Sequence, residues 1–269
     1  MVSEEGLLNY PGLDKLSLTP PHDITGKEIS AYLPPIGPGD RKNCKKGADL
    51  ILRLTEESRK FLKSHPVNLA RRKRGLVPGN SIWLWGQGRS PRMGTLKERF
   101  GIEGSVISAV HLLKGIGILA GLGVLEVPGA TGYFDTNYEG KARYALDCLK
   151  EKDFVYVHVE APDEAGHMGD LKLKIEAIEA FDQRVVGPIL KGMADFERYR
   201  VMVLPDHPTP LSIRTHAADP VPYVIYSNVN GGKNKHGKAF DEKAAKESGI
   251  FIEKGCELIE KFLRPDLSC

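Results

Sequence analysis

Short apolar segments alternate with helical segments from about residue 80 onward, and this alternation limits the folds open to the chain more than any other feature. The expected strands lie at residues 81–85, 123–127, 153–160, 200–204 and 221–226. Helices are expected among them, at residues 106–119, 141–150 and 171–190. Strands separated by helices form parallel sheets that are covered on both faces. The fold class is therefore expected to be α/β, with a mostly parallel sheet and helices on both faces.

The helix expected at 171–190 is amphipathic. Its apolar residues recur at helical spacing, which predicts that one face packs on the core: Leu171, Ile175, Ile178, Phe181 and Val185. The segment DFVYVHVE at 153–160 has the strongest β pattern of the chain. His158 lies inside it and is expected to be packed and hydrogen-bonded rather than to bind a ligand.

The first 78 residues differ from the rest in composition and charge. Pro and Gly cluster at 34–39, as is typical of connecting loops, and a helix is expected at 48–64. Residues 41–75 carry a net charge of +9 within a chain of net charge +3. Such a stretch is either a solvated helix face or an anion pocket, and nucleic-acid binding is disfavoured because few aromatic residues accompany the basic ones. Two domains are expected, at 1–78 and 79–269.

The remaining composition describes an ordinary globular protein. Of the 269 residues, 41% are hydrophobic and 27% charged, which excludes a disordered or collagen-like chain. The four cysteines are widely spaced, which indicates reduced thiols rather than a disulfide framework. Apolar runs are too short to span a membrane, and the N-terminus lacks the pattern of a signal peptide. We therefore expect a cytoplasmic protein without a membrane partner.

Acidic and histidine side chains follow the ends of the expected strands. Asp163 and His167 follow the strand at 153–160, Asp206 and His207 follow the strand at 200–204, and His216 precedes the last strand. Reactive groups of parallel sheets gather at the carboxyl ends of the strands. Carboxylate and imidazole ligands together suit Mn²⁺, Zn²⁺ or Mg²⁺. Each Asp–His pair alone is typical of a capped turn, but the set as a whole predicts a metal site.

Several motifs carry a resemblance to a known family. They are LTPPHDITGK, HPVNLARRKRG, SIWLWGQG, ISAVHLLKGIG, VPGATGYFDTNY, VHVEAPDEAGHMGD, PDHPTP and RTHAADPVP. These motifs resemble the archaeal-type branch of the cofactor-independent phosphoglycerate mutases, within the alkaline phosphatase-like metalloenzyme superfamily. The resemblance implies interconversion of 3-phosphoglycerate and 2-phosphoglycerate in glycolysis, through a phosphoserine and two divalent metal ions, with Mn²⁺ foremost and Zn²⁺ or Mg²⁺ as alternatives.

The resemblance also implies roles for individual residues. One metal is expected to be held by Asp163, His167 and His216, and the second in part by Asp206 and His207. Lys114 matches an active-site lysine of the family. The residues expected to bind substrate are Arg71, His22 and Asp23. His111 stands where the family pattern has an Asp.

The family's early Asp-Gly strand and its nucleophilic Ser find no match in this sequence. The resemblance then implies that residues 1–78 are the C-terminal part of an inserted α+β substrate-binding domain, and that residues 79–269 form the metal-binding domain. We expect such a chain to lack mutase activity alone, to bind the second metal weakly, and to self-associate into a homo-oligomer through exposed apolar surface.

Two other functions stay open. The first is a related metal-dependent phosphotransferase or phosphatase, because the same branch includes homoserine kinase-like relatives. It would share the metal ligands and differ in the substrate pocket, so the basic stretch at 41–75 is the discriminating feature. The second is a metal-binding remnant without catalysis.

Overall fold

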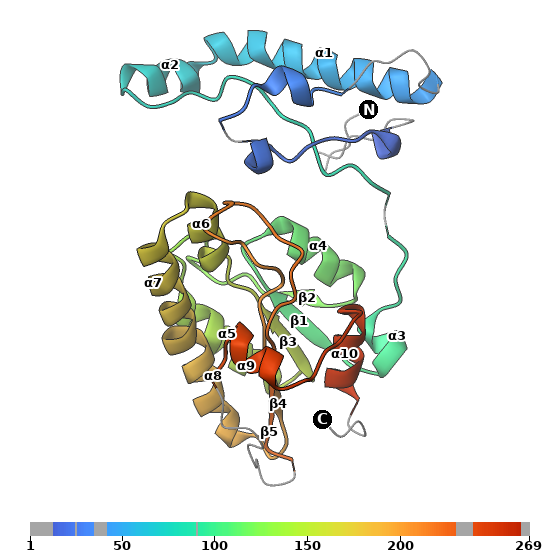
Figure 1. Cartoon of the computed structure of the whole chain (residues 1–269), viewed down its shortest axis with the longest axis vertical. Coiled ribbons are helices and arrows are strands. Elements are labelled where there is room, and N and C mark those ends of the chain that lie inside the picture. Colours follow the sequence, from blue (N-terminus) through green and yellow to red (C-terminus); the bar gives the residue numbers. More distant parts are fainter. Residues whose placement is uncertain (1–12, 25, 35–41, 90, 230–238, 265–269) are drawn as a thin grey trace. The chain divides into compact units, whose positions relative to one another are not determined.

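The computed structural model describes residues 13–24, 26–34, 42–89, 91–229 and 239–264; for His22, Asp23 and residues 42–43 it describes the backbone only. The chain divides into two compact units, unit 1 (Met1–Pro91) and unit 2 (Arg92–Cys269). Figure 1 draws both units, coloured along the sequence.

Unit 1 is built on helix α1 (Lys42–Ser64), followed by α2 (Pro66–Lys73) and preceded by three short 3₁₀ turns at Leu13–Lys15, Pro21–Ile24 and Ile29–Tyr32. Pro66 opens α2, and the His65 side chain accepts a hydrogen bond from the Val67 backbone N–H at its N-terminus. A core cluster of the unit contains Leu13, Leu16, Ala48 and Ile51, with Leu84 packed against it.

The segment after α2 returns across unit 1 as extended chain, so the strand expected at 81–85 is wrong. Trp83 Nε1 donates to the Thr19 backbone oxygen over 2.8 Å, and Gln87 Nε2 donates to Leu16 O over 2.5 Å. These side-chain bonds to backbone oxygens fix the segment without a strand ladder. They also tie residues 83–87 to unit 1, which extends to Pro91.

Unit 2 contains three parallel strands in the order β2-β1-β3, where β1 is Gly104–Ile107, β2 is Gly123–Val124 and β3 is Phe154–Val157. Val106 pairs with Val124 on one side and with Tyr156 on the other. The α/β class and its parallel sheet are therefore confirmed. The helix expected from residue 106 is wrong at its start, because residues 106–107 belong to β1 and the helix begins at His111.

The last two strands depart from the parallel pattern. β4 (Arg200–Val203) and β5 (Val224–Ser227) pair with each other in antiparallel fashion, with Met202 opposite Ile225. The two strands are joined by loop rather than by a helix. Two adjacent parallel strands need a crossover connection, which is usually a helix. The loop between β4 and β5 reverses the chain direction instead, so the two strands pair in antiparallel fashion.

Helices flank the three parallel strands. Figure 1 shows α5 (Tyr138–Leu149), α7 (Leu171–Phe181) and α8 (Gly187–Gly192) on one side of the strands and α3 (Leu96–Phe100), α4 (His111–Leu119) and α10 (Cys256–Leu263) on the other. Two further helices complete the unit, α6 (Ala161–Met168) and α9 (Glu242–Glu247). Two apolar clusters lie between the layers: Tyr138, Ala161, Ala177 and Val185, and Ile107, Val127 and Ala145.

The inward face predicted for residues 171–190 is only partly right. Val185 is buried and Phe181 is half-buried, but Leu171, Ile175 and Ile178 are 61%, 48% and 50% exposed. The reason is a π-helical turn at Asp182–Val186, between α7 and α8. A π turn holds one residue more than an α turn, so it changes which residues of α7 lie on the same face as Val185. In α7 the buried residue is Ala177 instead of the predicted apolar residues.

Among the residues that the structure describes, no helix combines the length and the apolar composition that crossing a bilayer requires.

Candidate metal centre

Helix α6 presents the first two candidate ligands. It begins directly after β3, with Pro162 in its first turn, and ends at Gly169, whose φ is 70°. Asp163 and His167 are four residues apart and therefore share one face of the helix. Their side chains meet, with 3.2 Å between Asp163 Oδ2 and His167 Nε2.

Two more histidines come from residues 207–216, which we call the histidine loop. Backbone hydrogen bonds hold the loop closed, among them those from Arg214 N to Pro210 O over 2.9 Å and from Ala217 N to Pro208 O over 3.0 Å. The loop lies tightly on α6 at Gly166, where a Cβ would come within 2.5 Å of Thr209 O. Only glycine permits this approach.

The ligand atoms of Asp163, His207 and His216 all lie within 4.8 Å of one another. His167 joins them, with its Nε2 3.1 Å from His216 Nε2, and the rings of His207 and His216 lie 3.9 Å apart between centroids. The carboxylate and two imidazoles of this group, with a third imidazole beside them, form the mixed oxygen and nitrogen donor set that suits a divalent transition metal. The donor set therefore fits the metal that the sequence predicts.

His207 has neighbours from both of the expected metal sites. Its Nε2 lies 3.4 Å from Asp206 Oδ2, the partner expected at the second metal, and it also clusters with Asp163 and His216 of the first. The other carboxylate oxygen of Asp206, Oδ1, accepts a hydrogen bond from the His207 backbone N–H over 3.0 Å. How the five residues divide between metals stays a prediction.

Thr209 and Lys174 support the cluster and were missed in the sequence. Thr209 is buried, its Oγ1 donates to Asp163 Oδ1, and it lies 3.3 Å from His207 Nδ1. Lys174 of α7 donates to Thr209 O over 2.8 Å, and burial lowers the pKa of Lys174. Thr209 follows His207 by only two residues, and that proximity was the one signal available.

The backbone of Arg214 sets the orientation of His167. His167 Nδ1 lies 3.0 Å from the Arg214 backbone oxygen. A carbonyl oxygen can only accept, so this contact places the proton on Nδ1 and leaves Nε2 as the ligand atom facing Asp163 and His216.

A second polar group lies at the carboxyl ends of β1 and β3. His158 Nδ1 is 3.3 Å from Ser108 Oγ, and Lys141 donates to His158 O over 2.9 Å. Burial lowers the pKa of His158 and lowers that of Lys141 to about 8, while burial and the charge of Glu164 raise the pKa of Glu160. His158 is thus packed and hydrogen-bonded, as expected.

The other predicted site residues have contacts of their own wherever their side chains are described. Lys114 of α4 contacts both carboxylate oxygens of Glu126 at 2.7 Å. In unit 1, Arg71 Nε donates to Val77 O over 2.7 Å and Arg72 Nη1 donates to Lys63 O over 2.9 Å. The side chains of His22 and Asp23 lie outside what the structure describes. Their roles stay predictions.

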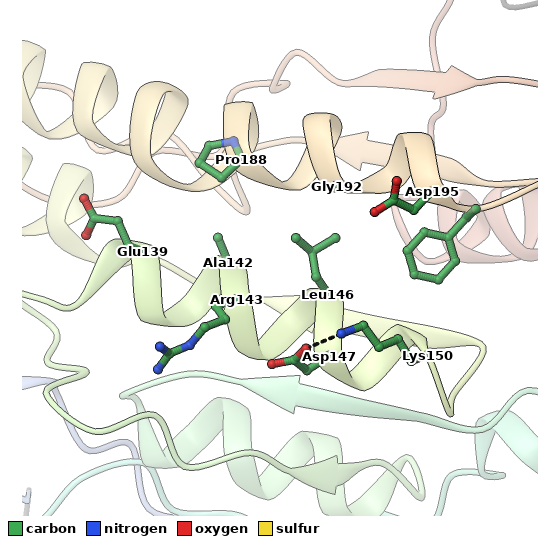
Figure 2. Close-up of a pocket in the computed structure, with 10 residues that line it drawn as sticks. Glu139, Ala142, Arg143, Leu146, Asp147, Lys150, Pro188, Gly192 and Asp195 are labelled. Atoms are coloured by element: carbon green, nitrogen blue, oxygen red, sulfur yellow. Dashed lines mark hydrogen bonds and ion pairs between the residues drawn. The ribbon is translucent and has the colours of Figure 1, made fainter.

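A cavity of about 430 Å³ lies between α5 and α8. Figure 2 shows its apolar residues, among them Ala142, Leu146 and Pro188, with the Asp147–Lys150 ion pair at its edge. None of its lining residues is a metal-ligand candidate. The cavity therefore gives no support to the predicted chemistry.

Comparisons with known proteins agree with the donor set. The model of the metalloenzyme superfamily matches residues 21–260. The chain is 49% identical over 248 residues to a probable 2,3-bisphosphoglycerate-independent phosphoglycerate mutase of Geobacter sulfurreducens, covering 92% of this chain and 60% of that protein. It is 50% identical over 272 residues to the mutase of that name from Methanosarcina barkeri, covering 96% of this chain and 66% of that protein.

A solved structure from Pyrococcus horikoshii is also similar, with a TM-score of 0.64 and 32% identity over 77% of this chain and 53% of that one. The chain spans about 60% of the length of the first curated relatives. The family model covers most of the chain, and the converging carboxylate and imidazoles match its description. The chain belongs to the metalloenzyme superfamily.

Proposed function

We propose that this chain supplies the metal-binding part of a cofactor-independent phosphoglycerate mutase, which interconverts 3-phosphoglycerate and 2-phosphoglycerate. The observation that carries the proposal is the convergence of Asp163, His207 and His216, with His167 beside them. The chain's sequence is also 49% and 50% identical to two proteins that are named as such mutases. A place in glycolysis and in the cytoplasm is part of the same proposal.

The residues present would hold divalent metal, with Mn²⁺ as the proposed ion. A bound divalent ion supplies positive charge that polarises phosphoryl oxygens and stabilises charge on entering and leaving oxygens. The chain's own residues prepare that site: Thr209 fixes the Asp163 carboxylate, and the Arg214 carbonyl orients His167. Such outer partners typically set ligand orientation and metal affinity.

Substrate binding is proposed for Lys114, Arg71, His22 and Asp23, as the resemblance implies. In this arrangement the Lys114 ammonium is held by Glu126, so an anionic substrate would compete with that carboxylate. Residues 1–91 are proposed as the substrate-binding unit and residues 92–269 as the metal-binding unit. The whole activity is proposed for a protein of the relatives' length, of which this chain spans about 60%.

The first test is metal binding by the chain itself. Mn²⁺ titration by calorimetry should show binding that Asp163→Asn, His207→Ala and His216→Ala each weaken by at least about tenfold. His111→Ala is the matched control, because His111 is an exposed histidine at the start of α4 and should leave Mn²⁺ affinity unchanged. Equal Mn²⁺ affinity in all four variants and the unaltered chain would contradict the proposed metal site.

The second test is the reaction. A protein extended to the length of the relatives should interconvert the two phosphoglycerates with Mn²⁺ and lose that activity with EDTA. If it instead hydrolyses or transfers phosphate from other small esters and leaves phosphoglycerate unchanged, the related phosphotransferase or phosphatase replaces the mutase. If it binds metal and acts on neither, the chain is a metal-binding remnant.

A further inference from the structure

Arg214 has an unusual backbone in the histidine loop. Its φ is 54°, and among the residues that the structure describes it is the one non-glycine residue with positive φ. L-residues other than glycine adopt this region at an energetic cost, and such strain clusters at functional sites. The conformation places the Arg214 carbonyl oxygen 3.0 Å from His167 Nδ1.

The same conformation sends the Arg214 side chain onto the end of α6. Its guanidinium lies against Gly169, where a Cβ would come within 2.9 Å of Cζ and 3.0 Å of Nη2. Gly169 itself has a φ of 70° and follows His167 by two residues. Two left-handed residues thus face each other, and the missing Cβ of Gly169 is what leaves room for the guanidinium.

The charge of Arg214 is available. Arg214 is exposed, and no carboxylate or other acceptor among the described residues pairs with its guanidinium. It is the one Lys or Arg of residues 205–217, between the two histidines that the loop brings to Asp163. One structural role would account for its position, because a cation at the C-terminus of α6 interacts favourably with the helix dipole.

We propose that Arg214 is a substrate-binding residue of the metal centre, which donates hydrogen bonds to phosphoryl oxygens of a phosphate ester bound there. The proposal rests on the proposed function, since it needs metal at Asp163, His207 and His216. A guanidinium offers a planar fork of N–H donors that matches phosphate oxygens in a way that an ammonium does not. The Arg214 backbone orients a ligand of the metal, and its side chain binds the anion.

The test separates the backbone from the side chain. Arg214→Gly keeps a residue that adopts positive φ freely and removes the guanidinium, while Arg214→Lys keeps the charge and removes the fork. Arg198→Gln is the matched control, because Arg198 is an exposed arginine just before β4, at the strand end opposite to His207. The Mn²⁺ affinity of each chain is measured first, and then the affinity of each Mn²⁺-loaded chain for orthophosphate and for glycerate, by calorimetry.

We expect Arg214→Gly to bind Mn²⁺ as the unaltered chain does and to bind orthophosphate about tenfold or more weakly, since hydrogen bonds to charged groups are lost. Arg214→Lys should recover part of the loss, and Arg198→Gln should show none. If Arg214→Gly also loses Mn²⁺ affinity, the comparison of Arg214→Lys with the unaltered chain decides, because that variant changes the head group alone.

Equal orthophosphate affinity in Arg214→Lys, Arg214→Gly and the unaltered chain would overturn the proposal while the metal site stands. A lower melting temperature without a change in orthophosphate affinity would assign Arg214 to the helix dipole and overturn it as well. Loss of glycerate binding but not of orthophosphate binding would show that the arginine binds a carboxylate instead. Failure of the unaltered chain to bind Mn²⁺ at all would defeat the proposed function, and this proposal with it.

Discussion

Lys141 donates a hydrogen bond to the backbone oxygen of His158 over 2.9 Å, although only 1% of the lysine is exposed. His158 follows β3 directly, and the chain enters α6 three residues later. The buried ammonium on α5 therefore holds the junction between the strand and the helix that carries Asp163 and His167. Burial lowers the pKa of Lys141 to about 8.

Replacement of Lys141 should change how stability depends on pH. The unfolded chain keeps this proton up to a pKa near 10.5, while the folded chain releases it near 8, so between these values the unfolded state binds more protons. Through this group the free energy of unfolding rises with pH across that window. Lys141→Met should remove the rise, as measured by urea unfolding at several pH values between 7.5 and 10.5.

Lys150→Met is the control for that series. The Asp147 carboxylate raises the pKa of Lys150, so its contribution to stability has the opposite sign and is lost as pH rises. Lys150→Met should therefore not flatten the rise. A Lys141→Met protein whose pH dependence matches that of the unaltered chain would contradict the assignment.

Thr209→Val should weaken metal binding with little change in shape. The valine keeps the size of the side chain but removes the hydroxyl that donates to Asp163. Loss of a hydrogen bond to a ligating carboxylate typically lowers metal affinity by about 10–100-fold. Mn²⁺ calorimetry measures the effect, with Ser212→Ala, an exposed hydroxyl in the same loop, as control. Equal affinities in both variants would show that Thr209 does not support the ligand.

Gly166→Ala should separate α6 from the histidine loop. The new Cβ would meet Thr209 O at 2.5 Å, so backbone must move, at a cost of about 1–3 kcal/mol in the free energy of unfolding. Mn²⁺ affinity should fall with it, because the loop carries His207 and His216.

Gly115→Ala in α4 is the matched control for that glycine. A Cβ there meets nothing within 4 Å, so alanine should stabilise the helix by about 0.5–1 kcal/mol and leave Mn²⁺ affinity unchanged. If the Gly166→Ala protein has the Mn²⁺ affinity and the unfolding free energy of the unaltered chain, the close approach of Gly166 to Thr209 contributes to neither.

Val185→Ala and Ile178→Ala test the rotated face of the long helical segment. Val185 is 1% exposed, and its truncation should cost about 2 kcal/mol through lost burial and a cavity. Ile178 is 50% exposed, and its truncation should stay within about 0.5 kcal/mol. Urea unfolding of each variant gives the comparison. A larger loss for Ile178→Ala than for Val185→Ala would mean that Ile178 is covered in solution, as in a self-associated state.

The sequence by itself determined the α/β class, the presence of β3, and the position of Asp163 and His167 just after that strand. These are local properties. A β run carries its own periodicity in the sequence, and the residues that follow it directly lie at the end of the strand wherever the strand lies. The positions of His207 and His216 after β4 and before β5 were also readable, because strand ends gather at one edge.

Only the tertiary structure decided which of these ligands share one place, and what supports them. The antiparallel pairing of β4 with β5 follows from a long-range register, and the π turn at Asp182–Val186 rotated a face that spacing alone put inward. Thr209, Lys141 and Arg214 act through contacts with residues 17 to 47 positions away. Local periodicity carries no information on such contacts, because packing between distant segments and the space that Gly166 and Gly169 leave decide them.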